Sequence, residues 1–180
     1  MISWPDPLPS FGAIVLRPFR VDDLHLVEAL AADPYVPLIG SIPSPYSEAE
    51  GLAYLARQHQ RLADGTGYSF AIADRADDRA LGGAGLWLQA PDDRATLGYA
   101  VAPANRGRGI AAEALQALTA FGWSLPSLSR LELYIEPWNG ASIRTAERCG
   151  YVLEARLPAH TVIGGTPRDM LRYVQERATG

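Results

Sequence analysis

The segment spanning residues 94–112 limits the fold most, because it passes from strand to helix through a short glycine-rich loop. Its first part is mostly apolar and suited to a strand that Pro103 ends, and apolar side chains recur at helical spacing from Ile110 onward. Gly107 and Gly109 free the backbone just before that helix. A helix start preceded by glycines presents unpaired N–H groups and the positive end of the helix dipole to one point. The segment therefore predicts a site for a phosphate group, such as a pyrophosphate.

Two phosphate-binding patterns fit this loop. Gly107-x-Gly109-x-x-Ala112 matches the dinucleotide fingerprint, which needs a strand running directly into the first glycine. Here residues 102–106 intervene, and the remaining chain holds only about half of a doubly wound sheet. The other pattern is Arg106-x-x-Gly109-x-Ala111, in which Arg106 and Arg108 add charge-assisted contacts to the phosphate.

Composition excludes several classes of protein. The chain has 180 residues, 48% of them hydrophobic and 20% charged, which suits one domain with a full core. Its net charge of −4 argues against a nucleic-acid surface and mildly favours cationic partners. The single cysteine, Cys149, excludes an internal disulfide and a thiolate metal site, and the three histidines lack ligand spacing, so we expect no metal. No stretch is long enough to span a membrane and the N-terminus has no signal-peptide layout, so we expect a cytoplasmic protein.

Hydrophobic periodicity and the positions of proline and glycine predict the element order β-α-α-β-β-β-α-β-α-β-β. The expected strands cover residues 13–17, 68–74, 81–89, 94–101, 130–135, 151–157 and 169–174. The expected helices begin after Asp22 or Asp23, at Glu48, at Ile110 and at Asn139, and prolines exclude a helix over residues 33–45. This order predicts an α+β sheet with helices on its faces.

Several local features can be compared with the structure. Ser47 and Glu50 predict a capping box for a helix over residues 48 to about 64, with Leu52 and Leu55 among its inward side chains. Residues 160–167 are expected to form a loop. Residues 1–12 contain three prolines and are expected to be a loosely tied lead, followed by a single domain over residues 13–176.

Further motifs match one family at consistent spacing. Arg106-x-x-Gly109-x-Ala111 resembles the (Gln/Arg)-x-x-Gly-x-(Gly/Ala) signature of the GNAT N-acetyltransferases. The chain resembles the RimJ/RimL-like branch of that family, the ribosomal-protein-alanine acetyltransferase type, in Leu16-Arg-Pro-Phe19 with Asp22-Asp23, Leu97-Gly-Tyr-Ala-Val101, Asn139-Gly-Ala-Ser-Ile143, Ala146-Glu-Arg-Cys-Gly-Tyr151 and Arg168-Asp-Met-Leu-Arg-Tyr173. The resemblance implies the acyl-CoA N-acyltransferase fold, with a mixed, mostly antiparallel central sheet and helices on both faces.

The resemblance also implies a set of site residues, with acetyl-CoA as the acetyl donor and co-substrate. The family's fourth and fifth strands splay apart, and the backbone of Tyr99 and Val101 would pair with the pantetheine arm in that gap. Asn139 would hydrogen-bond the arm, and Ser142 would be the catalytic acid that protonates the leaving thiolate. Many members place a tyrosine acid one turn further along, where this chain has Ala146. The residues implied to hold the pyrophosphate are Arg106, Gly107, Arg108, Gly109, Ile110 and Ala111.

Plainer interpretations stay open for some of these residues. Asn139 is equally well explained as a helix N-cap and Ser142 as a first-turn residue. The general base is Glu132, Glu136 or water, and both glutamates are also explained as exposed strand residues. A protein α-amine has a pKa near 7.7–8.0 against about 10.4 for lysine, so a site without an obvious base favours an α-amine.

The sequence thus predicts an N-acetyltransferase acting on a primary amine, most simply the N-terminal α-amine of a protein or peptide. Two alternatives remain: acetylation of a small amine such as an amino acid, polyamine or aminoglycoside, and a non-catalytic acyl-CoA-binding sensor. The predicted partners are acetyl-CoA and the amine acceptor, with no nucleic acid or membrane, and the protein is a monomer or a homodimer.

Overall fold

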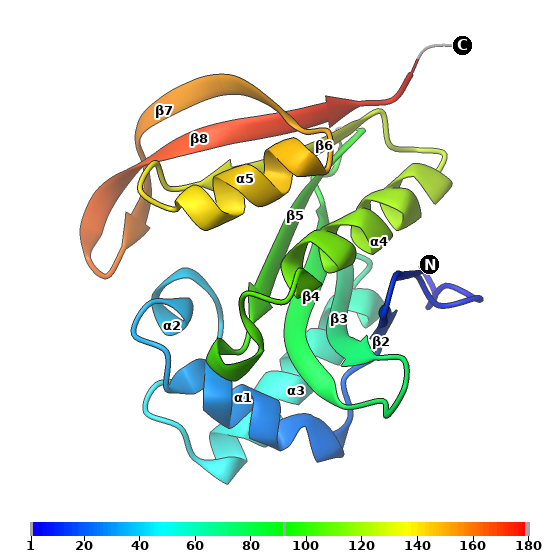
Figure 1. The fold of residues 1–180 in the computed structure, drawn as a ribbon, viewed down its shortest axis with the longest axis vertical. Helices are drawn as coiled ribbons and strands as arrows, with labels where there is room; N and C mark the ends of the chain where they lie inside the picture. Colours follow the sequence, from blue (N-terminus) through cyan, green and yellow to red (C-terminus); the bar gives the residue numbers. More distant parts are fainter. Residues whose placement is uncertain (1, 92, 179–180) are drawn as a thin grey trace.

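One mixed sheet runs through the computed structural model, which describes residues 2–91 and 93–178 (Figure 1). Its strands are β1 (Ser10–Phe11), β2 (Ile14–Arg17), β3 (Gly67–Asp74), β4 (Ala80–Leu88), β5 (Arg94–Val101), β6 (Arg130–Ile135), β7 (Val152–Ile163) and β8 (Thr166–Glu176). The spatial order is β1-β2-β3-β4-β5-β6-β8-β7, and neighbours are antiparallel except β5 and β6. The predicted meander of β3, β4 and β5 is confirmed, and the fold class is α+β as predicted.

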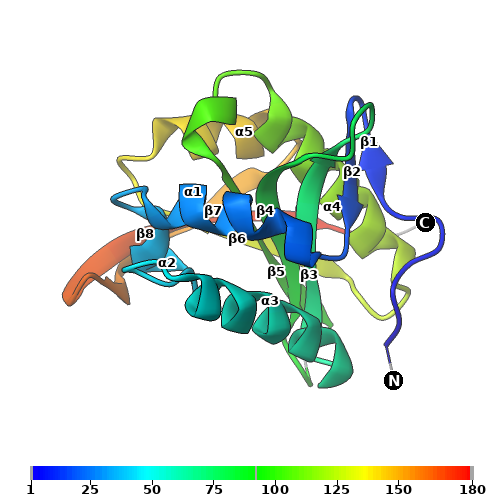
Figure 2. The same cartoon turned by 90° about the horizontal axis from the view of Figure 1, so that it is seen from below.

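Five helices cover both faces of this sheet. They are α1 (Leu24–Ala31), α2 (Val36–Ile39), α3 (Glu48–Ala63), α4 (Ile110–Ser124) and α5 (Gly140–Arg148). Figure 2 shows α3 below the sheet and α4 and α5 above it. No helix in the described part of the chain is long and apolar enough to cross a membrane.

The parallel pair β5 and β6 holds together at one end only. Backbone pairing joins residues 94–96 to residues 130–132 and stops at Thr96 and Glu132. Beyond this point β5 stays paired with β4 as far as Val101, and β6 stays paired with β8 as far as Ile135. Each strand therefore follows its other neighbour, and the two diverge as Figure 1 shows. The backbone of β5 beyond Thr96 has a free edge that faces β6.

Two apolar clusters fix the helices on the sheet. Under α4 and α5, one cluster includes the fully buried Leu115, Leu118 and Leu131. Under α1 and α3, the other includes Phe19, Leu26 and Leu55 among its buried members. Each such side chain contributes about 1.5–3 kcal/mol when fully buried, so the sheet is anchored on both faces.

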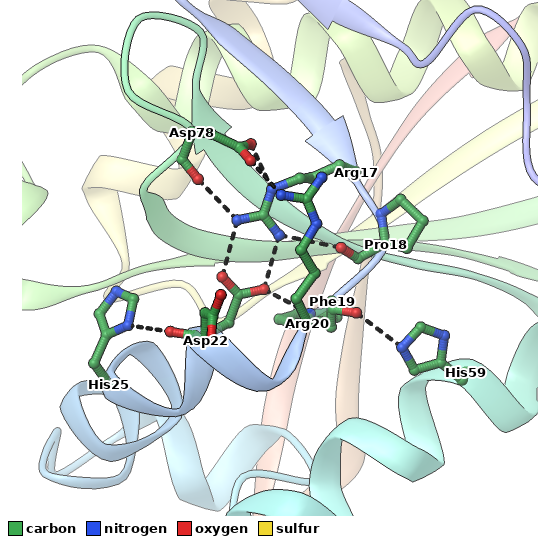
Figure 3. A network of polar contacts seen from close by, with 9 residues as sticks. Arg17, Pro18, Phe19, Arg20, Asp22, His25, His59 and Asp78 are labelled. Carbon is green, nitrogen blue, oxygen red and sulfur yellow. Dashed lines mark hydrogen bonds and ion pairs between the residues drawn. The ribbon is translucent and has the colours of Figure 1, made fainter.

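A buried arginine ties the start of α1 to the sheet (Figure 3). Arg17, at the end of β2, donates two hydrogen bonds to the carboxylate of Asp23, at 2.8 and 2.9 Å, and two to Asp78, one to its carboxylate at 2.7 Å and one to its backbone carbonyl at 2.8 Å. Asp23 precedes α1 but does not cap it through its side chain. Its carboxylate instead accepts from Arg17 and from the backbone N–H of Arg20. The predicted cap is wrong because the buried guanidinium of Arg17 competes for the same oxygens.

Other local predictions differ from the structure for tertiary reasons. The proline-rich connection contains the single-turn helix α2, whose first turn accommodates Pro37. Ser47 does cap α3 by accepting from the N–H of Glu50, but Leu52 is 42% exposed instead of facing the core. Residues 160–167 are not a loop, because β7 and β8 extend into a hairpin that turns at Gly164 and Gly165.

The first residues are packed against the domain. Ser10–Phe11 pairs with β2 as strand β1. The ring of Trp4 lies 5.5 Å from that of Phe70 and 6.1 Å from that of His59. Three prolines therefore give an irregular path here but do not prevent apolar contacts.

Candidate active site

A cavity of about 1210 Å³ follows the gap between β5 and β6. Residues of α4 and α5 line it on one face of the sheet, and residues of α2 and α3 on the other. All the predicted site residues except Arg108 line this cavity: Tyr99, Val101, Arg106, Gly107, Gly109, Ile110, Ala111, Asn139 and Ser142. The structure thus brings together residues from one strand, one loop and the starts of two helices.

The glycine loop has the geometry of an anion cradle. Gly107 and Gly109 adopt φ values of +76° and +80°, a region that L side chains rarely occupy. A Cβ at either position would meet no atom within 4 Å, so the space above the loop is open. Gly109 is the N-cap of α4 and makes no side-chain cap hydrogen bond. The first amides of α4, at Ile110 and Ala111, lack intrahelical partners and carry the positive end of the helix dipole. These features fit a pyrophosphate.

The two arginines of the loop are placed differently. Arg106 donates from Nε to the carbonyl of Val101 at 3.0 Å and from Nη2 to the carboxylate of Asp33 at 2.7 Å. Its side chain therefore braces the loop against β5 and the segment before α2. Burial acts to raise the pKa of Asp33, but hydrogen bonds from the N–H groups of Val36 and Tyr35 and from Arg106 hold that pKa below its usual value. Arg108 is exposed, and Asn105 is its hydrogen-bond partner at 3.5 Å.

The start of α5 presents Ser142 to the cavity. Asn139 is the N-cap, and its side-chain oxygen accepts from the N–H of Ser142 at 3.1 Å. Asn139 thus caps the helix through its side-chain oxygen, and the residue also lines the cavity. Ser142 is half-buried, while Ala146, one turn on, is fully buried.

The Tyr99 hydroxyl is buried without a hydrogen-bond partner among the described residues. It projects from β5 toward α5, where burial raises the pKa of Tyr99 and the nearby hydroxyls of Ser142 and Thr145 oppose that rise. In the described chain, only two other buried side-chain nitrogen or oxygen atoms lack a hydrogen-bond partner, Ser69 Oγ and Trp87 Nε1. Both residues also line the cavity. Buried unpaired polar atoms cost about 1–3 kcal/mol each, so their concentration here indicates a ligand site.

The two candidate bases are both buried, so their expected exposure is wrong. Glu132 accepts hydrogen bonds from Arg130 at 2.7 Å and from the Tyr134 hydroxyl at 2.8 Å, and it does not line the cavity. Glu136 lies at the open end of the gap, lines the cavity and is 4% exposed. The hydroxyl of Tyr35 donates to Glu136 at 2.5 Å, and Arg168 approaches it to 3.9 Å.

Sequence reasoning missed Tyr35, which comes from the proline-rich connection. Burial and the hydrogen bond to Glu136 raise the pKa of Tyr35, so its phenol keeps its proton and donates. The Trp138 ring packs edge-on to Tyr35 at 4.9 Å, and Trp138 is 62% exposed at the rim of the cavity. His160 stacks on Tyr134 at 5.1 Å, outside the cavity lining. No local pattern in the sequence signals the contact between Tyr35 and Glu136, because the two are 101 residues apart.

An amide-lined anion cradle that opens into a gap between diverging strands is the arrangement that the resemblance to the GNAT acyltransferases implied. Comparisons with known proteins agree. Residues 13–152 match the family model described as an acetyltransferase (GNAT) domain. The uncharacterised N-acetyltransferase p20 of Bacillus licheniformis is 25% identical over 162 residues, covering 89% of this chain and 90% of the relative.

Solved structures share the fold. Mycobacterium smegmatis RimJ in complex with CoA-disulfide has a TM-score of 0.79 and 21% identity, covering 94% of this chain and 84% of that one. A spermidine N-acetyltransferase SpeG chimera from Vibrio cholerae and hSSAT has a TM-score of 0.73 and 20% identity, covering 92% and 96%. The chain belongs to the GNAT acetyltransferase family and is an acetyl-CoA-dependent N-acyltransferase.

Proposed function

We propose that this protein transfers the acetyl group of acetyl-CoA to the N-terminal α-amine of a protein or peptide. The observation that carries the proposal is the position of Glu136 at the open end of the gap, in the same cavity as Ser142 and Tyr99. One cavity thus contains the proposed binding site for acetyl-CoA, the hydroxyls of Ser142 and Tyr99 on the α5 face, and the Glu136 carboxylate on the α3 face.

The donor occupies the α4 and α5 side in this proposal. Amides of residues 106–111 hold the pyrophosphate, and the free edge of β5 at Tyr99 and Val101 pairs with the pantetheine arm. Because the carbonyl of Val101 already accepts from Arg106, the N–H and C=O groups around Tyr99 provide most of that pairing. The exposed Arg108 contributes through its backbone amide and its positive charge.

The reaction needs one proton removed and one supplied. The neutral amine attacks the thioester carbonyl carbon, forming the C–N bond, and the C–S bond breaks. Glu136 accepts the proton that the amine loses, and Ser142, next to the Tyr99 hydroxyl, supplies a proton to the departing thiolate. Tyr35 positions the Glu136 carboxylate by its hydrogen bond. Glu132, held by Arg130 and Tyr134, has a structural role.

The α-amine is favoured because it is partly neutral near pH 7.5, whereas only about one lysine in a thousand is. A single carboxylate that already accepts a hydrogen bond is a modest base, which suits an acceptor of that pKa. A small amine is the alternative acceptor.

A thiol-release assay with mass spectrometry tests the proposal. The acceptors are a lysine-free peptide with a free N-terminus, the same peptide N-terminally blocked and carrying one lysine, and a panel of amino acids and polyamines. We expect acetylation of the free α-amine at a kcat/KM at least tenfold above that of the other acceptors. Turnover of small amines alone, or no acetylation of the free α-amine, would overturn the α-amine assignment.

A further inference from the structure

We propose that the α3 face of the cavity holds a subsite for a carboxylate, or a similar oxyanion, carried by the acceptor and bound about 10 Å from β5 at the edge of the gap. Arg61, Ser69 and Trp87 form this subsite. The inference rests on the proposed function, since it describes what else the acceptor must carry.

Two glycines on neighbouring strands form the floor of this subsite. Gly85 on β4 and Gly98 on β5 are backbone partners in the sheet. A Cβ at Gly85 would lie 2.6 Å from Cζ2 of Trp87, and one at Gly98 would lie 2.9 Å from its Cζ3. The indole of Trp87 therefore lies flat across both glycines, on the α3 face of the sheet.

Two hydrogen-bond donors meet beside this indole. Ser69 on β3 is the backbone partner of Gly85, and the Cε2 atom of Trp87, which bears Nε1, lies 3.0 Å from the position of a Cβ at Gly85. Ser69 is 3% exposed, and neither its hydroxyl nor Trp87 Nε1 has a hydrogen-bond partner among the described residues. Both residues line the cavity. Such donors are left unpaired in a fold only at a cost, so they indicate a group that accepts hydrogen bonds from them.

A positively charged side chain lies over the indole of Trp87. The guanidinium of Arg61, from α3, lies 5.5 Å from the ring centroid of Trp87. Arg61 lines the cavity and forms no salt bridge with any described acidic side chain. One turn earlier on the same helix, Arg57 donates to the carbonyl of Ser41 and stays outside the cavity lining. Of these two arginines on α3, only Arg61 lines the cavity, and its charge has no acidic partner among the described residues.

The hydrogen-bonding capacity and charge of these three side chains indicate which kind of ligand group they bind. Arg61 and Trp87 can only donate hydrogen bonds, and Ser69 can donate, so the matching group is an acceptor with negative charge. Gly98 and Ser69 are two strand spacings apart, about 10 Å, which an extended peptide covers in about three residues. The oxyanion comes either from an acidic residue near the third position of a peptide or from the far end of a small ω-amino acid.

Two matched acceptor pairs separate these sources. One pair is Ser-Ala-Glu-amide and Ser-Ala-Gln-amide, and the other is 8-aminooctanoate and its amide. We expect the wild-type kcat/KM to favour the charged member of one pair at least tenfold. That ratio should fall below about threefold in Arg61→Gln and decrease in Ser69→Ala, while Arg57→Gln keeps the wild-type ratio. A wild-type ratio near one in both pairs, or a ratio that Arg61→Gln leaves unchanged, would overturn the subsite.

A binding measurement separates this inference from the proposed function. The N-acetylated forms of the same peptides are titrated by calorimetry with CoA present, so no turnover is needed. We expect the Glu peptide to bind at least fivefold more tightly than the Gln peptide in the wild type but not in Arg61→Gln. If that difference appears without acetylation of any amine, the subsite stands and the transferase proposal fails. If amines are acetylated without any charge preference, the subsite fails alone.

Discussion

Glu132 and Glu136 lie on the same face of the same segment, yet their surroundings differ. Hydrogen bonds from Arg130 and Tyr134 satisfy Glu132 away from the cavity, whereas Glu136 accepts one hydrogen bond, from Tyr35, and lines the cavity. Sequence alone left the base open between these residues and water. The difference arises because the partners of Glu132 lie on β6 itself, whereas Tyr35 reaches Glu136 from the connection before α2, 101 residues away in the sequence.

Replacing Glu136 with Gln should lower kcat/KM for an α-amine acceptor by about 10²-fold near pH 7.5, because the proton acceptor is lost. The loss should shrink as pH rises, since more amine is already neutral. Steady-state rates between pH 6.5 and 9.5 measure this. Glu132→Gln is the matched comparison on the same strand, expected to lower the melting temperature but not to reproduce the pH-dependent loss. Equal pH profiles for Glu136→Gln and wild type would exclude Glu136 as the base.

Replacing Ser142 with Ala should lower kcat by about 10²-fold, because a proton donor to a leaving group acts mainly in the transition state. The acetyl-CoA dissociation constant should stay within about threefold of wild type, since the pyrophosphate cradle is untouched. Calorimetry and initial rates on the same preparation separate the two quantities. Ser124→Ala, whose hydroxyl donates to Phe121 at the far end of α4, serves as control. An unchanged kcat would assign the proton to water or to Tyr99.

At the scale of elements, the glycine loop and the start of α4 form the proposed binding site for the pyrophosphate of acetyl-CoA. Gly109→Asp should weaken acetyl-CoA binding at least tenfold, about 1.4 kcal/mol, because a carboxylate would enter the space where phosphate docks. Gly65→Asp is a close control: Gly65 has φ +70° and no atom within 4 Å of its Cβ position, but it lies in the turn after α3. Both variants carry similar backbone strain, so only the loop variant should lose affinity. Equal affinity in the two folded variants would make the glycine loop purely structural.

The regular elements around this loop were predictable because their signals are local. The bounds of β5 and β6 and the first residue of α4 agree with the structure, since Pro103, Gly109 and alternating apolar residues mark them directly. The helix α2 and the long β7–β8 hairpin were missed, because each depends on contacts made elsewhere in the fold. The gap at Thr96 follows from β5 and β6 each keeping its other neighbour, which sequence periodicity does not encode.

The candidate site also has a part that local sequence signals predict and a part that they do not. Sequence motifs pointed to residues that line the α4 and α5 side of the cavity, from Tyr99 to Ser142, because their spacing is short and their backbone geometry is special. On the opposite side only Glu136 was named from the sequence, as one of several possible bases. Tyr35, Arg61, Ser69 and Trp87 come from four different elements and meet only after the sheet has formed. In the sequence, Ser69 is an ordinary serine within a predicted strand, and nothing there indicates that its buried hydroxyl lacks a hydrogen-bond partner among the described residues.

At the scale of the whole molecule, Asp33 and Arg106 connect the two sides of the cavity. Asp33 accepts from Arg106 in the donor loop and from the N–H groups of Tyr35 and Val36 on the acceptor side. The same residue thus holds the phosphate loop and the segment that positions Glu136. Loss of this carboxylate should affect both stability and catalysis.

The depressed pKa of Asp33 makes part of the stability dependent on pH. The unfolded chain protonates this carboxyl at a higher pH than the folded chain, so its contribution is complete above about pH 5 and is lost as pH falls through the folded pKa. Asp33→Asn should therefore melt below wild type at pH 7, with a difference that narrows toward pH 3. Circular dichroism melts at several pH values measure this. A difference that stays constant or widens on acidification would contradict the assigned role.

The central claim is that the gap between β5 and β6, with the glycine loop, binds acetyl-CoA. Its most direct test is the melting temperature of the wild-type protein with acetyl-CoA and, separately, with NAD. A ligand that binds only the native state at 100 times its dissociation constant adds about 2.7 kcal/mol, or about 5 °C or more for a chain of this size. We predict such a rise with acetyl-CoA and none with NAD. A rise with NAD and no change with acetyl-CoA would contradict the account.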